Sequence, residues 1–190
     1  MDALATAFGV VLVAELGDKS MIFSLAAATR YRWWMVLLPV AVASALLAAI
    51  AVVIGEVAGQ VLGETLVALV AAGLFVAFGI WTWRSTSDAQ AIPQLAEAPV
   101  LRTMGALGLV FFVAELGDKS QVATLAVAGI HDGSAMLVWM GATAGMVATN
   151  AIGIAGGGWI RRRLAPRILR VVVATILIGF GVGMLAVALR

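Results

Sequence analysis

Long apolar runs alternate with short polar connections along the whole chain. A helix rises about 1.5 Å per residue, so roughly 20 apolar residues are needed to cross the hydrocarbon core of a bilayer. Runs such as residues 40–54 place apolar side chains on every face, which excludes the alternating pattern of outer-membrane barrel strands. We therefore predict an all-α membrane protein with six transmembrane helices: Ala3–Thr29, Trp33–Gly55, Thr65–Trp83, Thr103–Ile130, Ala135–Gly158 and Ile168–Leu189.

The longest polar connection divides these six spans into two groups of three. It covers residues 84–102 and contains the turn-forming and loop-forming residues Ser85, Asp88, Pro93 and Pro99. We predict a first three-helix repeat over residues 1–83, a linker over 84–102 and a second repeat over 103–190. Because each half has an odd number of spans, the second half enters the membrane from the opposite side, as an inverted repeat.

The basic residues predict the orientation, because Lys and Arg in short connections stay on the cytoplasmic side. The cytoplasmic linker 84–102 would then leave the N- and C-termini outside, where Arg190 lies. Five of the six tryptophans fall at the same predicted inner boundary. Nine arginines share this face: Arg30, Arg32, Arg84, Arg102, Arg161, Arg162, Arg163, Arg167 and Arg170.

Composition supports a membrane protein and excludes several kinds of site. The chain of 190 residues is 63% apolar and 12% charged, with a mean hydropathy of +1.10, whereas soluble domains are near half apolar and a quarter charged. Its net charge of +2 comes from connections between spans, so we expect a lipid bilayer and no nucleic acid as partner. The absence of cysteine and the single His131 exclude disulfides and thiolate or histidine-rich zinc and copper centres.

An exact internal repeat is the strongest feature of the sequence. Residues 13–20, Val-Ala-Glu-Leu-Gly-Asp-Lys-Ser, recur unchanged as residues 113–120. Each copy lies near the middle of a predicted span, on two helices that would run antiparallel. Gly17 and Gly117 either unwind their helices or let a neighbouring helix approach closely. Close packing is also the interpretation of the small-xxx-small pair Gly141 and Gly145.

Each copy places ionisable side chains deep in the bilayer, where a charged group costs about 2.5 to 3.5 kcal/mol. Residues at i, i+3 and i+4 share a helix face, so the acids and the lysine of each copy point together into the bundle. Ser24, Gln121 and Thr124 continue these rows with further oxygen atoms, and Met21 is interpreted as packing. Ser20 and Ser120 lie off the rows, and we expect them to bond to their own helices. The charged residues are Glu15, Asp18, Lys19, Glu115, Asp118 and Lys119.

The charge of this cluster suggests what it binds. Four carboxylates and two lysines leave −2 when all are ionised, which one divalent cation or two protons would cancel. Because the unoccupied, negatively charged site has a high free energy inside the membrane, it favours obligatory exchange of a divalent cation for protons. Lys19 and Lys119 would balance charge, or one of them would carry protons. Oxygen ligands suit Mg²⁺, Ca²⁺ and Mn²⁺, and we expect no resident cofactor. A purely structural salt-bridge network is the alternative, although such a network should be neutral.

The twin Glu-x-Gly-Asp-Lys-Ser motifs resemble the signature of the Golgi-type cation/proton exchangers, a family that includes Golgi calcium and manganese transporters and bacterial manganese exporters. The resemblance covers essentially the whole chain. It implies export of Mn²⁺, or of Ca²⁺, in exchange for protons, in the inner membrane of a bacterium. It also implies that Glu15, Asp18, Glu115 and Asp118 form the metal site. On the fifth helix, Thr149 and Asn150 are similar to the amide or acid often found there in the family.

Three other functions use similar residues. A cation channel could have an acidic constriction, but lysines inside a filter give it no advantage. An exporter of a small organic cation or an amino acid would need an apolar pocket beside the charges. A membrane-embedded hydrolase is disfavoured by the lack of histidine ligands, so we expect no enzyme activity. The sequence leaves open whether the chain works alone or as a homodimer.

Overall fold

The structure is a computed structural model that describes residues 2–84, 98–131, 133–163 and 166–189, and these residues form helices joined by short connections. The all-α prediction is therefore confirmed for the described residues. Most of the predicted linker 84–102 lies outside the described residues, as do the side chains of the five arginines between positions 161 and 170. The helices in chain order are α1 (Asp2–Glu15), α2 (Lys19–Ala28), α3 (Trp33–Leu62), α4 (Glu64–Arg84), α5 (Val100–Glu115), α6 (Lys119–Ile130), α7 (Ala135–Arg163) and α8 (Pro166–Ala188).

Two of the predicted spans are not continuous helices. The predicted span Ala3–Thr29 is broken between α1 and α2, and the predicted span Thr103–Ile130 is broken between α5 and α6, whose axes differ by 69°. Both breaks fall at the glycine of the repeat, where the backbone is left-handed, with φ of 73° at Gly17 and 79° at Gly117. Glycine adopts this conformation without the steric cost that a Cβ would add. The glycines therefore unwind their helices, and the prediction that each repeat lies on one helix face is wrong.

The other four predicted spans each begin within two residues of a helix start, although α3 and α7 continue beyond their predicted ends, and the described part of α8 is too short to count as a candidate span. By length and composition α3, α4 and α7 can cross a bilayer, and the bent pair α5–α6 is a fourth candidate when taken as one span. Large apolar side chains face outward along α3, including Leu38, Val42 and Leu46, which are 53%, 61% and 55% exposed. A bilayer is the environment in which such a surface is stable.

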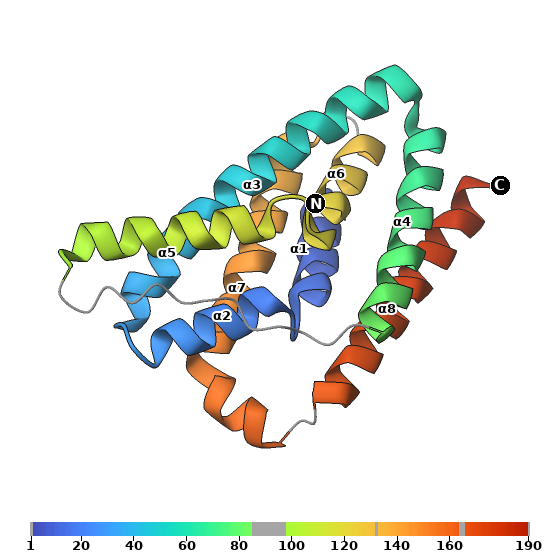
Figure 1. Cartoon of the computed structure of the whole chain (residues 1–190). Helices are drawn as coiled ribbons and strands as arrows, with labels where there is room; N and C mark the ends of the chain where they lie inside the picture. The colour runs from blue at the N-terminus through green and yellow to red at the C-terminus, as the bar shows by residue number, and fades with distance from the viewer. Residues whose placement is uncertain (1, 85–97, 132, 164–165, 190) are drawn as a thin grey trace.

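The two broken pairs are each held by a long helix from the other half of the chain. Both α1 and α2 pack against α7, whereas both α5 and α6 pack against α3. The inner helices α1 and α6 also contact each other, and α4 and α8 lie side by side at the edge of the bundle (Figure 1). This crossed packing brings the two breaks together in the interior.

Glycine permits the closest of these helix contacts. A Cβ added to Gly145 on α7 would lie 2.9 Å from the carbonyl oxygen of Phe8 on α1, and one added to Gly141 would overlap the carbonyl of Leu4. On the other side, a Cβ at Gly59 of α3 would lie 2.5 Å from the carbonyl oxygen of Gly129 on α6. The close-packing interpretation of Gly141 and Gly145 is therefore confirmed, and equivalent contacts hold α3 to α6.

Candidate functional site

The local sequence builds the same turn at both breaks. Glu15 is the last residue of α1, and the backbone N–H of Asp18 donates to its carbonyl oxygen at 3.1 Å. The N–H of Asp118 donates to the carbonyl of Glu115 at the same distance, 3.1 Å. Each aspartate then occupies the N-cap position of the following helix in an extended conformation, without a capping hydrogen bond from its side chain. The repeat thus places one acid at a helix C-terminus and one at a helix N-terminus.

The four acids of the two breaks form one cluster. Glu15 and Glu115 are fully buried, and the side chains of Asp18 and Asp118 are 16% and 18% exposed. Each residue offers one carboxylate oxygen, and these four oxygens lie within 4.8 Å of one another. The structure therefore brings together the four acids that the sequence singled out, although it does so at two helix breaks rather than along two helix faces.

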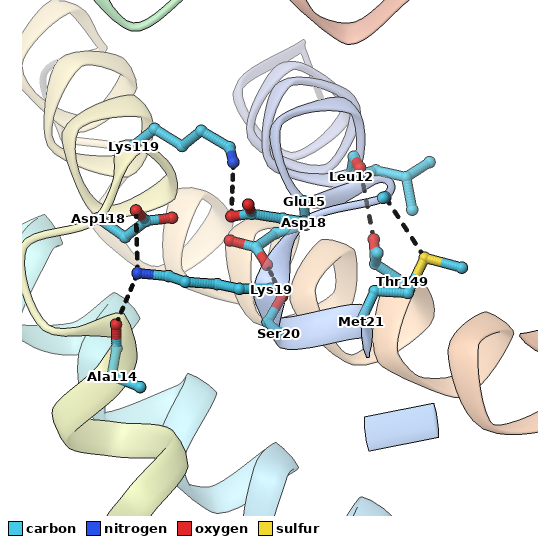
Figure 2. A network of polar contacts seen from close by, with 11 residues as sticks. Leu12, Glu15, Asp18, Lys19, Ser20, Met21, Ala114, Asp118, Lys119 and Thr149 are labelled. Atoms are coloured by element: carbon cyan, nitrogen blue, oxygen red, sulfur yellow. Dashed lines mark hydrogen bonds and ion pairs between the residues drawn. The ribbon is translucent and has the colours of Figure 1, made fainter. Parts of the chain in front are cut away.

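The two lysines cross between the copies. The Nζ atom of Lys119 lies 2.5 Å from Oδ2 of Asp18, and Nζ of Lys19 lies 3.6 Å from Oδ1 of Asp118 (Figure 2). Each lysine therefore pairs with the aspartate of the other half. This reciprocal pairing ties the two breaks together and leaves both glutamates without an ion pair to a described lysine or arginine.

Several carboxylate oxygens of the cluster lack a partner. Oε1 of Glu15, both oxygens of Glu115 and Oδ2 of Asp118 are buried and accept no hydrogen bond from any described residue. An unsatisfied buried acceptor costs about 1 to 3 kcal/mol, and a charged one costs more. Four neighbouring carboxylates with several unpaired oxygens offer free acceptors that a cation or protons can satisfy.

The helix ends have the polarity that such a cluster needs. The N-termini of α2 and α6 carry partial positive charge, which favours the carboxylates of Asp18 and Asp118. The C-termini of α1 and α5 carry partial negative charge, where the anionic Glu15 and Glu115 are disfavoured unless a cation lies beside them. Half-helix ends that meet at a break form cation sites in transporters for the same reason.

Ser20 belongs to the site, contrary to the sequence prediction. Its hydroxyl donates to Oε2 of Glu15, whereas Oγ of the equivalent Ser120 is buried without a partner among the described residues. The prediction was wrong for Ser20 because it assumed a continuous helix, in which residue 20 points away from residue 15. The sequence did contain a signal for this role, because the identical residues of the two copies include this serine.

The predicted auxiliary residues lie on α2, α6 and α7. Ser24 donates to Oδ1 of Asn150 at 2.5 Å, which joins α2 to α7, and Thr124 donates to the carbonyl of Ser120 at 2.8 Å. Gln121 is buried, and its Nε2 atom has no partner in the described part of the chain. The Ser24 hydroxyl thus joins two helices, whereas the Thr124 hydroxyl bonds within its own helix.

Two further residues complete the surroundings of the first break. Met21 is buried, as its packing interpretation predicted, and its sulfur also accepts a hydrogen bond from the Gly17 N–H at 3.4 Å. Thr149 on α7 was named beside Asn150 in the sequence analysis but was not predicted as a ligand. Its hydroxyl lies 3.4 Å from the carbonyl oxygen of Leu12, near the end of α1. This contact depends on how α7 packs, which the spacing of residues in the sequence does not reveal.

Comparisons with known proteins found a family match and a similar sequence. The model of a family described as Divalent cation/proton antiporter GDT1 matches residues 3–90 and 103–190, one match for each half of the chain. GDT1-like protein 3 of Arabidopsis thaliana is 25% identical over 205 residues, which cover 95% of this chain and 69% of that protein. No solved structure matches the chain.

Proposed function

The chain belongs to the GDT1 family of divalent cation/proton antiporters, and from this premise we propose that it exports Mn²⁺ from the cytoplasm in exchange for protons. Ca²⁺ is the next candidate substrate. Members of this family are multi-pass membrane transporters and not enzymes, so the cation is cargo rather than a resident cofactor. The choice of cation and the direction of transport are parts of the proposal.

One observation carries the proposal: four carboxylates meet between two helix breaks, and several of their buried oxygens have no partner among the described residues. Glu15, Asp18, Glu115 and Asp118 each supply an oxygen within a 4.8 Å cluster. Hard divalent cations such as Mn²⁺ and Ca²⁺ are bound by such oxygens. Softer metals prefer thiolate and imidazole ligands, whereas this cluster consists of four carboxylates. These four acids are the proposed metal ligands.

The charges of the cluster support exchange. Each aspartate is paired with a lysine, so the excess charge of −2 resides on the two glutamates. One divalent cation or two protons would neutralise it, and the unloaded cluster is the most costly state in a low-dielectric interior. Lys19 and Lys119 would then balance the aspartates throughout the cycle. Ser24, Gln121, Thr124 and Asn150 are proposed only as auxiliary groups, since two of them hold helices together here.

The proposed topology treats each broken pair as one span. This gives six transmembrane segments in two inverted repeats, residues 1–83 and 103–190, in the inner membrane of a bacterium. The arginines at positions 30, 32, 84 and 102 support a cytoplasmic linker 84–102 and external termini. In the cysteine-free chain, a single cysteine in the linker should react only from the cytoplasmic side, and Val61→Cys only from outside. The reverse pattern would reject this orientation.

Transport by purified protein in vesicles tests the proposal. Proteoliposomes with an imposed pH gradient are supplied with Mn²⁺, Ca²⁺, Mg²⁺ or lysine, and both metal and proton movement are recorded by fluorescence. We expect Mn²⁺ to move in one direction while protons move in the other. With equal Mn²⁺ concentrations on both sides of the membrane, this movement should stop when the pH gradient is removed. Conductive, pH-independent cation currents would instead indicate a channel. Transport of lysine without metal movement would indicate an exporter of organic solutes.

A further inference from the structure

The two lysines lie in different surroundings although the eight-residue repeats that contain them, residues 13–20 and 113–120, are identical. The side chain of Lys119 is 8% exposed and is held by Asp18 in the acid cluster. The side chain of Lys19 is 33% exposed, and besides its long contact with Asp118 it donates to the carbonyl oxygen of Ala114 at 3.0 Å (Figure 2). Lys19 therefore serves two acceptors, one in the cluster and one in the backbone of the other half.

The carbonyl that Lys19 contacts lies at the end of a helix. Since α5 ends at Glu115, the carbonyl of Ala114 is one of the last four, which have no donor within the helix. An ammonium group at a helix C-terminus is also favoured by the helix dipole. Lys19 thus links α2 of the first half to the end of α5 in the second half.

The break in the first half is held by different groups. Thr149 contacts the end of α1, Met21 accepts a hydrogen bond from Gly17, and Ser20 donates to Glu15. At the second break the equivalent serine has no partner among the described residues, and Leu116 is 61% exposed, whereas Leu16 is half-buried. Leu116 and Gly117 of the second break are thus more exposed than Leu16 and Gly17 of the first.

The repeat itself cannot cause this difference, because residues 13–20 and 113–120 are identical. The groups that the lysines contact, an aspartate carboxylate and an alanine carbonyl, lie within these identical residues, so each copy offers the lysine of the other copy the same two acceptors. Inverted repeats in transporters move relative to each other around a fixed central site, which exchanges the surroundings of the two halves.

We propose that Lys19 and Lys119 are positioning residues that exchange roles between the two access states. In the state seen here, Lys19 donates a hydrogen bond to the Ala114 carbonyl at the end of α5, and the buried Lys119 forms an ion pair with Asp18. In the opposite state, Lys119 donates a hydrogen bond to the carbonyl of Ala14, the equivalent of Ala114. Lys19 is then buried and forms an ion pair with Asp118. The inference rests on the proposed antiport, because only a transporter that alternates needs both arrangements.

Thiol labelling in the cysteine-free chain tests this exchange in two ways. The first compares Lys19→Cys with Lys119→Cys in detergent without metal, using aminoethyl methanethiosulfonate, a small cationic thiol reagent. A buried position reacts only from minor states, which are about 0.1–10% populated, so position 19 should react at least about tenfold faster than position 119. The adduct restores an ammonium group at each position, so recovery of thermal stability after labelling shows that the variants are folded.

The second comparison keeps both lysines and uses Leu16→Cys and Leu116→Cys in proteoliposomes. At rest, Leu116→Cys should react faster, and during sustained Mn²⁺/proton exchange the ratio of the two rates should fall towards one. Equal rates at positions 19 and 119, or a Leu116-to-Leu16 ratio that exchange leaves unchanged, would overturn the proposal. Transport by the wild-type chain is measured in the same vesicles. If the wild-type chain transports Mn²⁺, either of these labelling results rejects only the exchange of roles between the lysines. If the wild-type chain moves no divalent cation, the proposed function and this inference are rejected together.

Discussion

The break between α1 and α2 and the break between α5 and α6 have the same backbone and different neighbours. Both have a left-handed glycine and the same hydrogen bond from the aspartate N–H to the glutamate carbonyl. In the first, Ser20 is bonded to Glu15 and α7 covers the end of α1, whereas in the second the equivalent serine has no partner within the described ranges. The comparison teaches that the repeat encodes the turn, and that packing against α3 or α7 decides which contacts the turn makes.

The largest expected effect is shared by both breaks. Glu15→Gln and Glu115→Gln each remove an anionic oxygen ligand and half of the excess charge. Each should reduce Mn²⁺/proton exchange by more than about 100-fold, because changes at residues that only support metal ligands already cost about 10- to 100-fold in metal affinity or activity. Flux into proteoliposomes measures the loss. Glu56→Gln on α3, which lies outside the cluster, is the matched control and should transport normally. Near-normal exchange by either cluster variant would remove that glutamate from the site.

The aspartates should differ in their effect on stability. Asp18→Asn leaves the buried ammonium of Lys119 without its partner, and breaking a buried pair costs about 3–5 kcal/mol. Asp118→Asn should cost less, because Lys19 is partly exposed and keeps its contact with the Ala114 carbonyl. Thermal unfolding of the two variants in the same detergent compares them. If Asp118→Asn unfolds at the lower temperature, the assigned burial of the two lysines is reversed.

A smaller difference is expected between the two serines. Ser20→Ala removes a hydrogen bond to a carboxylate, worth about 1.5–3 kcal/mol, and should lower both stability and apparent Mn²⁺ affinity. Ser120→Ala removes a hydroxyl that has no partner among the described residues and should be close to wild type. Unfolding temperature and Mn²⁺ titration of both variants are the measurements. Equal losses would mean that the two breaks are equivalent in solution.

The smallest effect concerns the backbone of the break. Gly117→Ala places a Cβ in open space but at a φ of 79°, so its cost of about 1–2 kcal/mol comes from conformation alone. Gly105→Ala, in the helical part of α5 and also in open space, should stabilise the protein by roughly 0.5–1 kcal/mol. Chemical unfolding of both variants gives the comparison. A stabilising Gly117→Ala would mean that α5 and α6 are continuous.

The sequence predicted the positions of most helices because long apolar runs end at polar or turn-forming residues. The predicted spans beginning at Trp33 and Ala135 start at the same residues as α3 and α7. The breaks could not be decided from the pattern, because a glycine in an apolar run serves equally well for unwinding and for close packing. Gly17 unwinds its helix, whereas Gly145 packs on α1.

The acid cluster was predictable from the repeat, since ionisable groups at mid-membrane must face one another rather than lipid. The partners within the cluster were not. That Lys119 pairs with Asp18 depends on how the two breaks meet in space, and Ser20 enters the site only because the helix restarts after Gly17. Spacing along one chain segment carries no information on either contact.

The central claim is that the acids of both breaks hold one divalent cation together. Anomalous scattering at the manganese absorption edge, from crystals of the full chain grown with Mn²⁺, tests this most directly. We expect one anomalous peak between the two breaks, roughly 2.0–2.6 Å from carboxylate oxygens of both Glu15 and Glu115, the range of oxygen ligands to hard cations. A peak bound by the acids of one break alone, or no peak between the breaks at saturating Mn²⁺, would contradict the claim.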